Sequence, residues 1–122
     1  MAEADVNVII LPNIPGSEND TTAKIYECLG SYRPVLAAVP LDGAAAEVLR
    51  RFDGVWLCDP DDVEGQARAI TEIYRRWLAG DGRVRRPIEQ MREFTREYQA
   101  GQLAGCLDST LPQRRRSPGA IR

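Results

Sequence analysis

Two short apolar runs constrain the fold of this chain more than any other feature. The first, residues 6–11, is rich in β-branched side chains and leads into a loop of Pro, Gly, Ser and Asn at residues 12–21. A short amphipathic stretch at residues 22–31 follows, and then the second run, residues 35–39. Continuous apolar runs of this length are typical of parallel strands buried on both faces, and the crossover between parallel strands is usually a helix. The segment therefore predicts a strand–loop–helix–strand unit.

The alternation of strands and helices continues through the middle of the chain. We predict a short helix at residues 44–52, a third strand at residues 55–58 and a longer helix at residues 63–79. The acidic turn at residues 59–62 supplies carboxylates for the N-terminal cap and the dipole of the longer helix. The side chains expected on the core face of that helix are Ala67, Ile70, Tyr74, Trp77 and Leu78. This order predicts an α/β fold: a Rossmann-like parallel sheet of about three strands flanked by helices.

The C-terminal part of the chain carries no further strand pattern. Residues 80–86 are interpreted as a linker, and Pro87 suits the first turn of a final helix that reaches residue 107. The apolar positions of this helix are Ile88, Met91, Phe94, Tyr98, Leu103 and Leu107. Residues 110–122, with three consecutive arginines, are expected to form a disordered basic tail.

Composition argues against several classes of protein. The 122 residues carry a formal net charge of −2, which gives no reason to expect a nucleic-acid partner. No apolar run reaches the roughly 20 residues of a membrane span, and the acidic N-terminus lacks a signal-peptide pattern. Cys28, Cys58 and Cys106 are scattered and odd in number, which favours reduced, buried thiols. We therefore expect a cytoplasmic protein whose contact with membranes is at most peripheral.

The sequence contains no histidine. This removes the commonest general base and the most frequent metal ligand. We assign no catalytic residue within the chain.

The loop at residues 12–21 is the candidate binding site. It follows the carboxyl end of a predicted strand and precedes a helix that Asp20 or Thr21 can cap. Open α/β sheets bind ligands at this edge, over a helix N-terminus. A ligand is thus expected at this loop.

A set of short segments matches one family of enzymes. The segments are Ala4-Asp5-Val6 with the run to Pro12, Pro15-Gly16-Ser17-Glu18-Asn19, Lys24-Ile25-Tyr26-Glu27-Cys28-Leu29 and Arg33-Pro34-Val35-Leu36-Ala37. Together with residues 43–47, 59–62 and the last helix, they resemble family 4 glycosyltransferases. These are GT-B enzymes that bind a nucleotide-sugar in a C-terminal Rossmann-like domain. The resemblance implies that the chain needs no metal and no other cofactor. The similarity covers residues 3–109, so the resemblance implies that residues 1–109 are a partial domain of this kind, its second half.

The resemblance also implies a role for each matching residue. In the family, the loop and helix start hold the diphosphate and the donor sugar of the nucleotide-sugar. The corresponding residues here are Gly16, Ser17, Glu18, Asn19, Asp20, Thr21 and Thr22. Glu27 matches the second Glu of the family's Glu-x7-Glu motif, which binds ribose hydroxyls, and Lys24 could reach a phosphate. The first Glu of the motif falls on Asn19, and Glu18 lies one residue too early.

Two parts of the family's machinery lie outside this sequence: the phosphate-binding Arg and Lys pair and the acceptor-binding N-terminal domain. We therefore expect an incomplete fragment that binds a nucleotide-sugar donor without transferring the sugar alone. Residues 6–11 would also lack a neighbouring strand on one side. A bare apolar edge of this kind predicts a homodimer or aggregation.

Simpler interpretations remain open beside the resemblance. Lys24 and Glu27 could be an ordinary surface pair one helical turn apart, and Ser17 and Asn19 could be ordinary turn residues. The acidic turn at residues 59–62 could suggest a metal or phospho-acceptor site, although helix capping explains it. The alternative function is a non-catalytic α/β module that binds a nucleotide or another protein.

Overall fold

The computed structural model describes residues 3–111, and its chain separates into two compact units whose boundary falls between Met91 and Arg92. The elements of the first unit are β1 (Asn7–Ile10), η1 (Ser17–Asn19), α1 (Ala23–Gly30), β2 (Val35–Ala38), α2 (Ala44–Leu49), β3 (Val55–Cys58), α3 (Val63–Leu78) and α4 (Ile88–Met91). Among the described residues, no helix is both long and apolar enough to cross a membrane.

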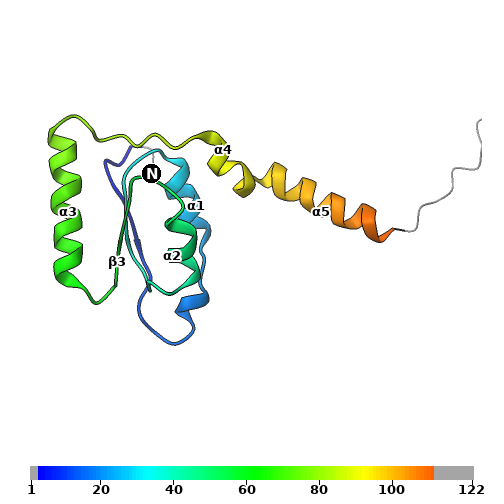
Figure 1. Ribbon diagram of the computed structural model, residues 1–122, viewed down its shortest axis with the longest axis horizontal. Coiled ribbons are helices and arrows are strands. Elements are labelled where there is room, and N and C mark those ends of the chain that lie inside the picture. The colour runs from blue at the N-terminus through cyan, green and yellow to red at the C-terminus, as the bar shows by residue number, and fades with distance from the viewer. Residues whose placement is uncertain (1–2, 112–122) are drawn as a thin grey trace, which may run out of the picture. The chain divides into compact units, whose positions relative to one another are not determined.

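The first unit is built on a sheet of three parallel strands in the order β1-β2-β3. Val8, Leu36 and Trp56 are aligned across the three strands, so these side chains share one face of the sheet. Helix α3 covers that face, and α1 and α2 lie against the other face (Figure 1). The predicted α/β fold, a parallel sheet of three strands flanked by helices, is confirmed and is consistent with a Rossmann-like arrangement.

The core is concentrated between the sheet and the helices α1 and α2. Strand β2 lies in the middle of the sheet, and all four of its residues are buried. The largest fully buried side chains are Ile9, Ile25, Leu29, Leu49, Val35 and Val39. The α3 face is thinner, with a small cluster of buried residues: Leu36, Cys58, Ala69 and Ile73.

Strand β1 differs from its prediction. Its buried and exposed residues alternate, because Asn7 and Ile9 are buried whereas Val8 is 42% and Ile10 69% exposed. The prediction of burial on both faces is therefore wrong for β1. The physical reason is that α3 packs on β2 and β3, so the α3-side face of β1 is left uncovered.

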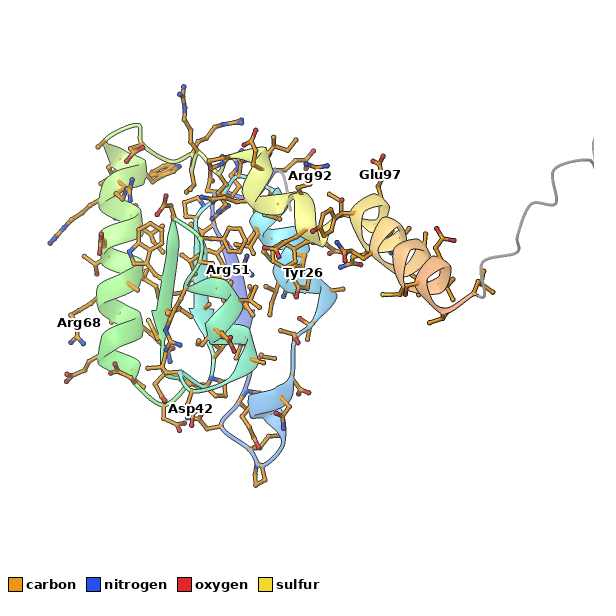
Figure 2. All side chains as sticks on the ribbon, turned by 45° about the vertical axis from the view of Figure 1, so that its right-hand side comes forward. Tyr26, Asp42, Arg51, Arg68, Arg92 and Glu97 are labelled. Carbon is orange, nitrogen blue, oxygen red and sulfur yellow. The ribbon has the colours of Figure 1, made fainter. Side chains whose placement is uncertain are left out.

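Helix α3 buries a different stripe from the predicted one. Ala69 and Ile73 are buried, whereas the five predicted core residues, Ala67, Ile70, Tyr74, Trp77 and Leu78, are all exposed. Ile70 and Tyr74 lie about 60° and 100° around the helix from Ile73, so the apolar arc is wider than the part that faces the sheet. Figure 2 shows Arg68 on the same helix, directed away from the sheet.

The uncovered part of this arc forms an apolar groove. The groove has a volume of about 430 Å³ and lies between α3 and the exposed face of β1. Its lining residues are Asp5, Val6, Val8, Leu36, Ile70, Ile73, Tyr74 and Trp77. Three of the residues predicted for the core of α3, Ile70, Tyr74 and Trp77, therefore line an open groove.

The predicted linker at residues 80–86 is anchored by one buried side chain. Arg86 is only 3% exposed, although it has no carboxylate partner among the hydrogen bonds it forms. Its guanidinium donates to four backbone carbonyl oxygens, those of Leu29 (2.9 Å), Arg33 (3.0 Å), Asp53 (3.0 Å) and Gly54 (3.2 Å). Burial lowers the pKa of Arg86, but a guanidinium stays protonated in proteins. The segment therefore ties the end of α1 to the chain that enters β2 and β3.

Gly54 allows Val84 of this segment to lie close to the backbone before β3. Its φ of 69° lies in the left-handed region, and a Cβ at this position would collide with both methyl groups of Val84. The N–H of Val84 donates to the carbonyl oxygen of Tyr32, 3.0 Å away. Both the backbone angle and the space therefore require glycine at position 54.

The second unit begins with η2 (Arg92–Phe94) and continues as α5 (Arg96–Thr110). The prediction of a single helix from residue 87 to residue 107 is wrong, because the α-helical conformation is interrupted between α4 and α5. Thr95 adopts an extended conformation, and its hydroxyl accepts a hydrogen bond from the N–H of Tyr98 at 3.2 Å, so it caps a new helix. Every residue of α5 is exposed, which also corrects the expectation that Cys106 is buried. Beyond Leu111, the predicted basic tail lies outside the described residues.

Replacing Arg86 should destabilise the first unit strongly. Arg86→Met removes the guanidinium from four carbonyl groups, of which that of Gly54 keeps the N–H of Val35. We expect a loss of about 2–4 kcal/mol in the free energy of unfolding. Urea denaturation followed by circular dichroism measures this loss. The matched control is Arg85→Met, because Arg85 is the exposed neighbour; a loss as large for the control would contradict the anchoring role of Arg86.

Substitution of Gly54 by alanine should lower the free energy of unfolding more than the same substitution at a glycine without close contacts. We expect Gly54→Ala to cost about 1–3 kcal/mol, because it adds both a strained φ and a collision with Val84. Gly30→Ala is the control, since it lies in α1 with no atom near the added methyl group. It should be neutral or stabilising by up to about 1 kcal/mol. Equal melting temperatures for the two variants would refute this prediction.

Candidate functional site at the carboxyl edge of the sheet

The loop after β1 is held in shape by Ser17. The Ser17 hydroxyl lies 2.6 Å from the carbonyl oxygen of Pro12 and 2.8 Å from that of Ile14. Ser17 is buried, whereas the neighbouring loop residues are exposed. The predicted ligand residue Ser17 therefore turns inward and supports the loop.

Gly16 and Glu18 close the loop on itself. Gly16 has a φ of 97°, a left-handed conformation that favours glycine, and it precedes η1. Its N–H donates to a carboxylate oxygen of Glu18 at 2.8 Å. The N–H of Asn19 donates back to the carbonyl oxygen of Gly16 at 3.2 Å. The N–H of Gly16, which the resemblance would assign to a phosphate, is thus already hydrogen-bonded to the Glu18 carboxylate.

The loop rests on the start of α2. A Cβ at Gly43 would lie 3.0 Å from the carbonyl oxygen of Glu18, so the two backbones are in close contact. Figure 2 shows Asp42 in the turn before α2, at the same end of the sheet as the loop. The absence of a side chain at Gly43 therefore sets how closely η1 approaches α2.

The first turn of α1 is exposed and has no side-chain cap. Thr22, not Asp20 or Thr21, is the N-cap residue; it is extended and its side chain makes no capping hydrogen bond. Thr21, Thr22, Lys24 and Glu27 are all exposed. A helix start in this state offers its first N–H groups and its positive dipole end to solvent or to an anion.

A bridge between the loops after β1 and β3 was not foreseen from the sequence. The side-chain NH₂ of Asn13 donates to carboxylate oxygens of Asp59 (3.0 Å) and Asp61 (2.8 Å). Since β2 lies between β1 and β3, this bridge crosses the carboxyl end of the central strand. The only signal in the sequence was that both segments follow strands and so share one edge of the sheet.

The acidic turn also caps α3. A carboxylate oxygen of Asp62 accepts the N–H of Gly65 at 2.9 Å, which confirms the predicted capping role of this turn. Gln66 supports the turn from within α3 by donating to the carbonyl oxygens of Asp59 and Pro60. Within residues 3–111, no group of three His, Cys, Asp or Glu side chains is arranged to hold a metal ion.

The electrostatics of this edge are mixed. Lys24 is the only Lys or Arg among residues 1–32, whereas Glu18, Asp20 and Glu27 are carboxylates of the same loop and helix. The helix start and Lys24 attract an anion, and the carboxylates oppose it. The structure thus brings residues 16–19 together in one loop and places Lys24 and Glu27 on the exposed side of the adjoining helix.

Two buried cysteines, Cys28 and Cys58, lie in α1 and at the end of β3. Burial raises the pKa of both the Cys28 and the Cys58 thiol. A thiol with a raised pKa is protonated and unreactive at neutral pH, so these two residues act as apolar core side chains.

Comparison with known proteins yields no match. No protein-family model, no curated protein and no solved structure matches the chain.

The thiols should differ in reactivity and should give stability a defined pH dependence. A thiol reagent at pH 8 should modify exposed Cys106 rapidly, and Cys28 and Cys58 only after unfolding.

Because the two buried thiols keep their protons to higher pH than in the unfolded chain, their stabilising contribution is complete below about pH 8.5. It is lost as the pH rises through their raised pKa values. Cys28→Ala/Cys58→Ala should therefore lose less unfolding free energy between pH 8 and pH 10; three equally fast thiols would contradict this assignment.

Proposed function

We propose that the loop after β1 and the first two turns of α1 form the donor-binding part of a glycosyltransferase-like domain of family 4, which binds a nucleotide-sugar. The observation that carries this proposal is the position of the loop. It is exposed, it lies at the carboxyl edge of a parallel sheet, and it leads into a helix whose N-terminus has no side-chain cap. Diphosphate groups bind at such helix starts because backbone N–H groups and the dipole stabilise negative charge.

Each exposed residue has a chemical role in this proposal. Glu27 accepts hydrogen bonds from ribose hydroxyls, and the Lys24 ammonium contacts a phosphate oxygen. The backbone at Thr21 and Thr22 and the side chain of Asn19 contact the diphosphate and the sugar. Ser17 and Gly16 support the loop shape. Glu18 must release the N–H of Gly16 if that group is to reach a phosphate.

We propose that the chain binds the donor without catalysing transfer on its own. Departure of a nucleoside diphosphate is assisted by preorganised cations and dipoles. Lys24 and one helix start are a small set for that task, since three carboxylates share the same loop and helix. A cytoplasmic location fits this proposal and the thiol state of the cysteines.

A second candidate is a non-catalytic α/β module that binds a neutral ligand or another protein. The observation that favours it is the bridge from Asn13 to Asp59 and Asp61, which adds two more carboxylates to the carboxyl edge. An acidic edge weakens anion binding.

An NMR titration of ¹⁵N-labelled protein with UDP, GDP and their sugar conjugates tests the proposal. We expect shifts confined to residues 16–27 and saturation at millimolar ligand. Glu27→Ala should weaken binding about tenfold, because two hydroxyl hydrogen bonds to a charged group are lost. Glu72→Ala, an exposed Glu on α3, is the control and should bind as the parent does. Absence of shifts at millimolar ligand would refute donor binding and favour the second candidate.

A further inference from the structure

Strand β1 presents unused backbone groups along one side. The N–H groups of Asn7 and Leu11 donate to the carbonyl oxygens of Pro34 and Ala38 on the β2 side, each at 2.9 Å. Because successive residues of a strand direct their N–H and C=O groups to opposite sides, those of Val8 and Ile10 point away from β2. Among the described residues, no strand lies beyond β1.

This edge, although short, lacks three of the features that normally prevent pairing. Residues 6–11 contain no charged residue and no proline, and no bulge interrupts the ladder to β2. At the opposite edge, β3, the Arg76 guanidinium lies 5.5 Å from the centre of the Trp56 ring, and Val84 packs against Gly54 just before the strand. The β1 edge is suited to pairing with another strand because its own residues do not obstruct it.

We propose that two copies of this protein pair through β1 in an antiparallel arrangement, which forms a continuous six-stranded sheet. The outward direction of these groups requires outward-facing residues such as Val8 and Ile10 to lie opposite each other. In the proposed register, Val8 of one copy exchanges both hydrogen bonds with Ile10 of the other. Ile9 then lies opposite Ile9 on the twofold axis. This register uses all the outward N–H and C=O groups of Val8 and Ile10 in four hydrogen bonds.

A second copy suits this edge for two reasons. The run has no charge, so two copies meet without like-charge repulsion across the axis. Val8 and Ile10, which are 42% and 69% exposed, become cross-strand neighbours on one face of the sheet. A twofold pair also ends at two copies, because it uses the β1 edge of both.

The pair should be weak and dependent on concentration. A contact between two four-residue strands buries little area, and small interfaces are typical of transient complexes. Sedimentation velocity from about 10 µM to about 1 mM should show a monomer that converts to a dimer. A chain that remains monomeric throughout this range, or that forms species larger than a dimer, overturns the proposal.

Amide hydrogen exchange provides the residue-specific test. In a monomer, Val8 and Ile10 exchange rapidly while Ile9 and Leu11 are protected. In the proposed pair, all four amides become protected as the concentration rises. Protection that keeps alternating at concentrations where sedimentation shows a dimer would place the interface elsewhere and overturn the proposal.

The decisive variant is Ile10→Pro, which removes an outward N–H and leaves the ladder to β2 intact. We expect its dimer dissociation constant to rise about tenfold or more, because two hydrogen bonds are lost symmetrically. Ile10→Lys serves as a second variant if the proline prevents folding, since this side chain is exposed. The control is Ile70→Lys in the groove, which should dimerise as the parent does. Dissociation by Ile70→Lys with no effect at Ile10 would identify the groove as the interface and overturn edge pairing.

Discussion

Burial of the central strand is the constraint on which the rest of the first unit depends. All four residues of β2 are buried, and the strand is flanked on both sides in the sheet by β1 and β3. Helices α1 and α2 complete one side of this core, and α3 covers the other. Because apolar area removed from water is the main favourable term in folding, the elements are arranged around β2 and the outer strands are covered less fully.

Unequal cover has different consequences at the two faces of β1. On the α1 side, Asn7 is buried and its side chain donates to the hydroxyl of Ser31 at 2.7 Å. On the α3 side, Val8 and Ile10 are exposed beside an apolar groove. The apolar arc of α3 spans both the covered and the uncovered part of this face. Hydrophobic periodicity therefore predicted burial for residues of α3 that are exposed, and missed the buried Ala69 and Ile73. A hydrophobic pattern shows that a surface is apolar, but neighbouring elements decide whether it is buried.

The two ends of the sheet are held together by different chemistry. At the amino end, the charged but buried Arg86 satisfies four carbonyl oxygens and fixes the segment after α3. At the carboxyl end, Asn13 joins the loop after β1 to the acidic turn after β3, and Glu18 closes the loop after β1. The first arrangement stabilises the fold by satisfying buried polar groups. The second leaves exposed Thr22, Lys24 and Glu27 beside a loop that its own residues already hold in shape.

The sequence by itself determined the fold class, the three strands and the capping of α3. Strands are short apolar runs between Pro- and Gly-rich turns, and Asp62 before a helix caps it through a contact three residues away. These are local properties, so they can be read along the chain. The sequence also marked the loop at residues 12–21 as the exposed connection at the carboxyl edge.

Only the tertiary structure decided which groups meet across long stretches of the chain. Arg86 lies 57 residues from Leu29, and Asn13 lies 48 residues from Asp61, so no periodicity or spacing relates these partners. The same is true of the exposed face of β1 and of the break before α5. Each depends on which other elements pack nearby, and packing is a property of the assembled core rather than of any segment within it.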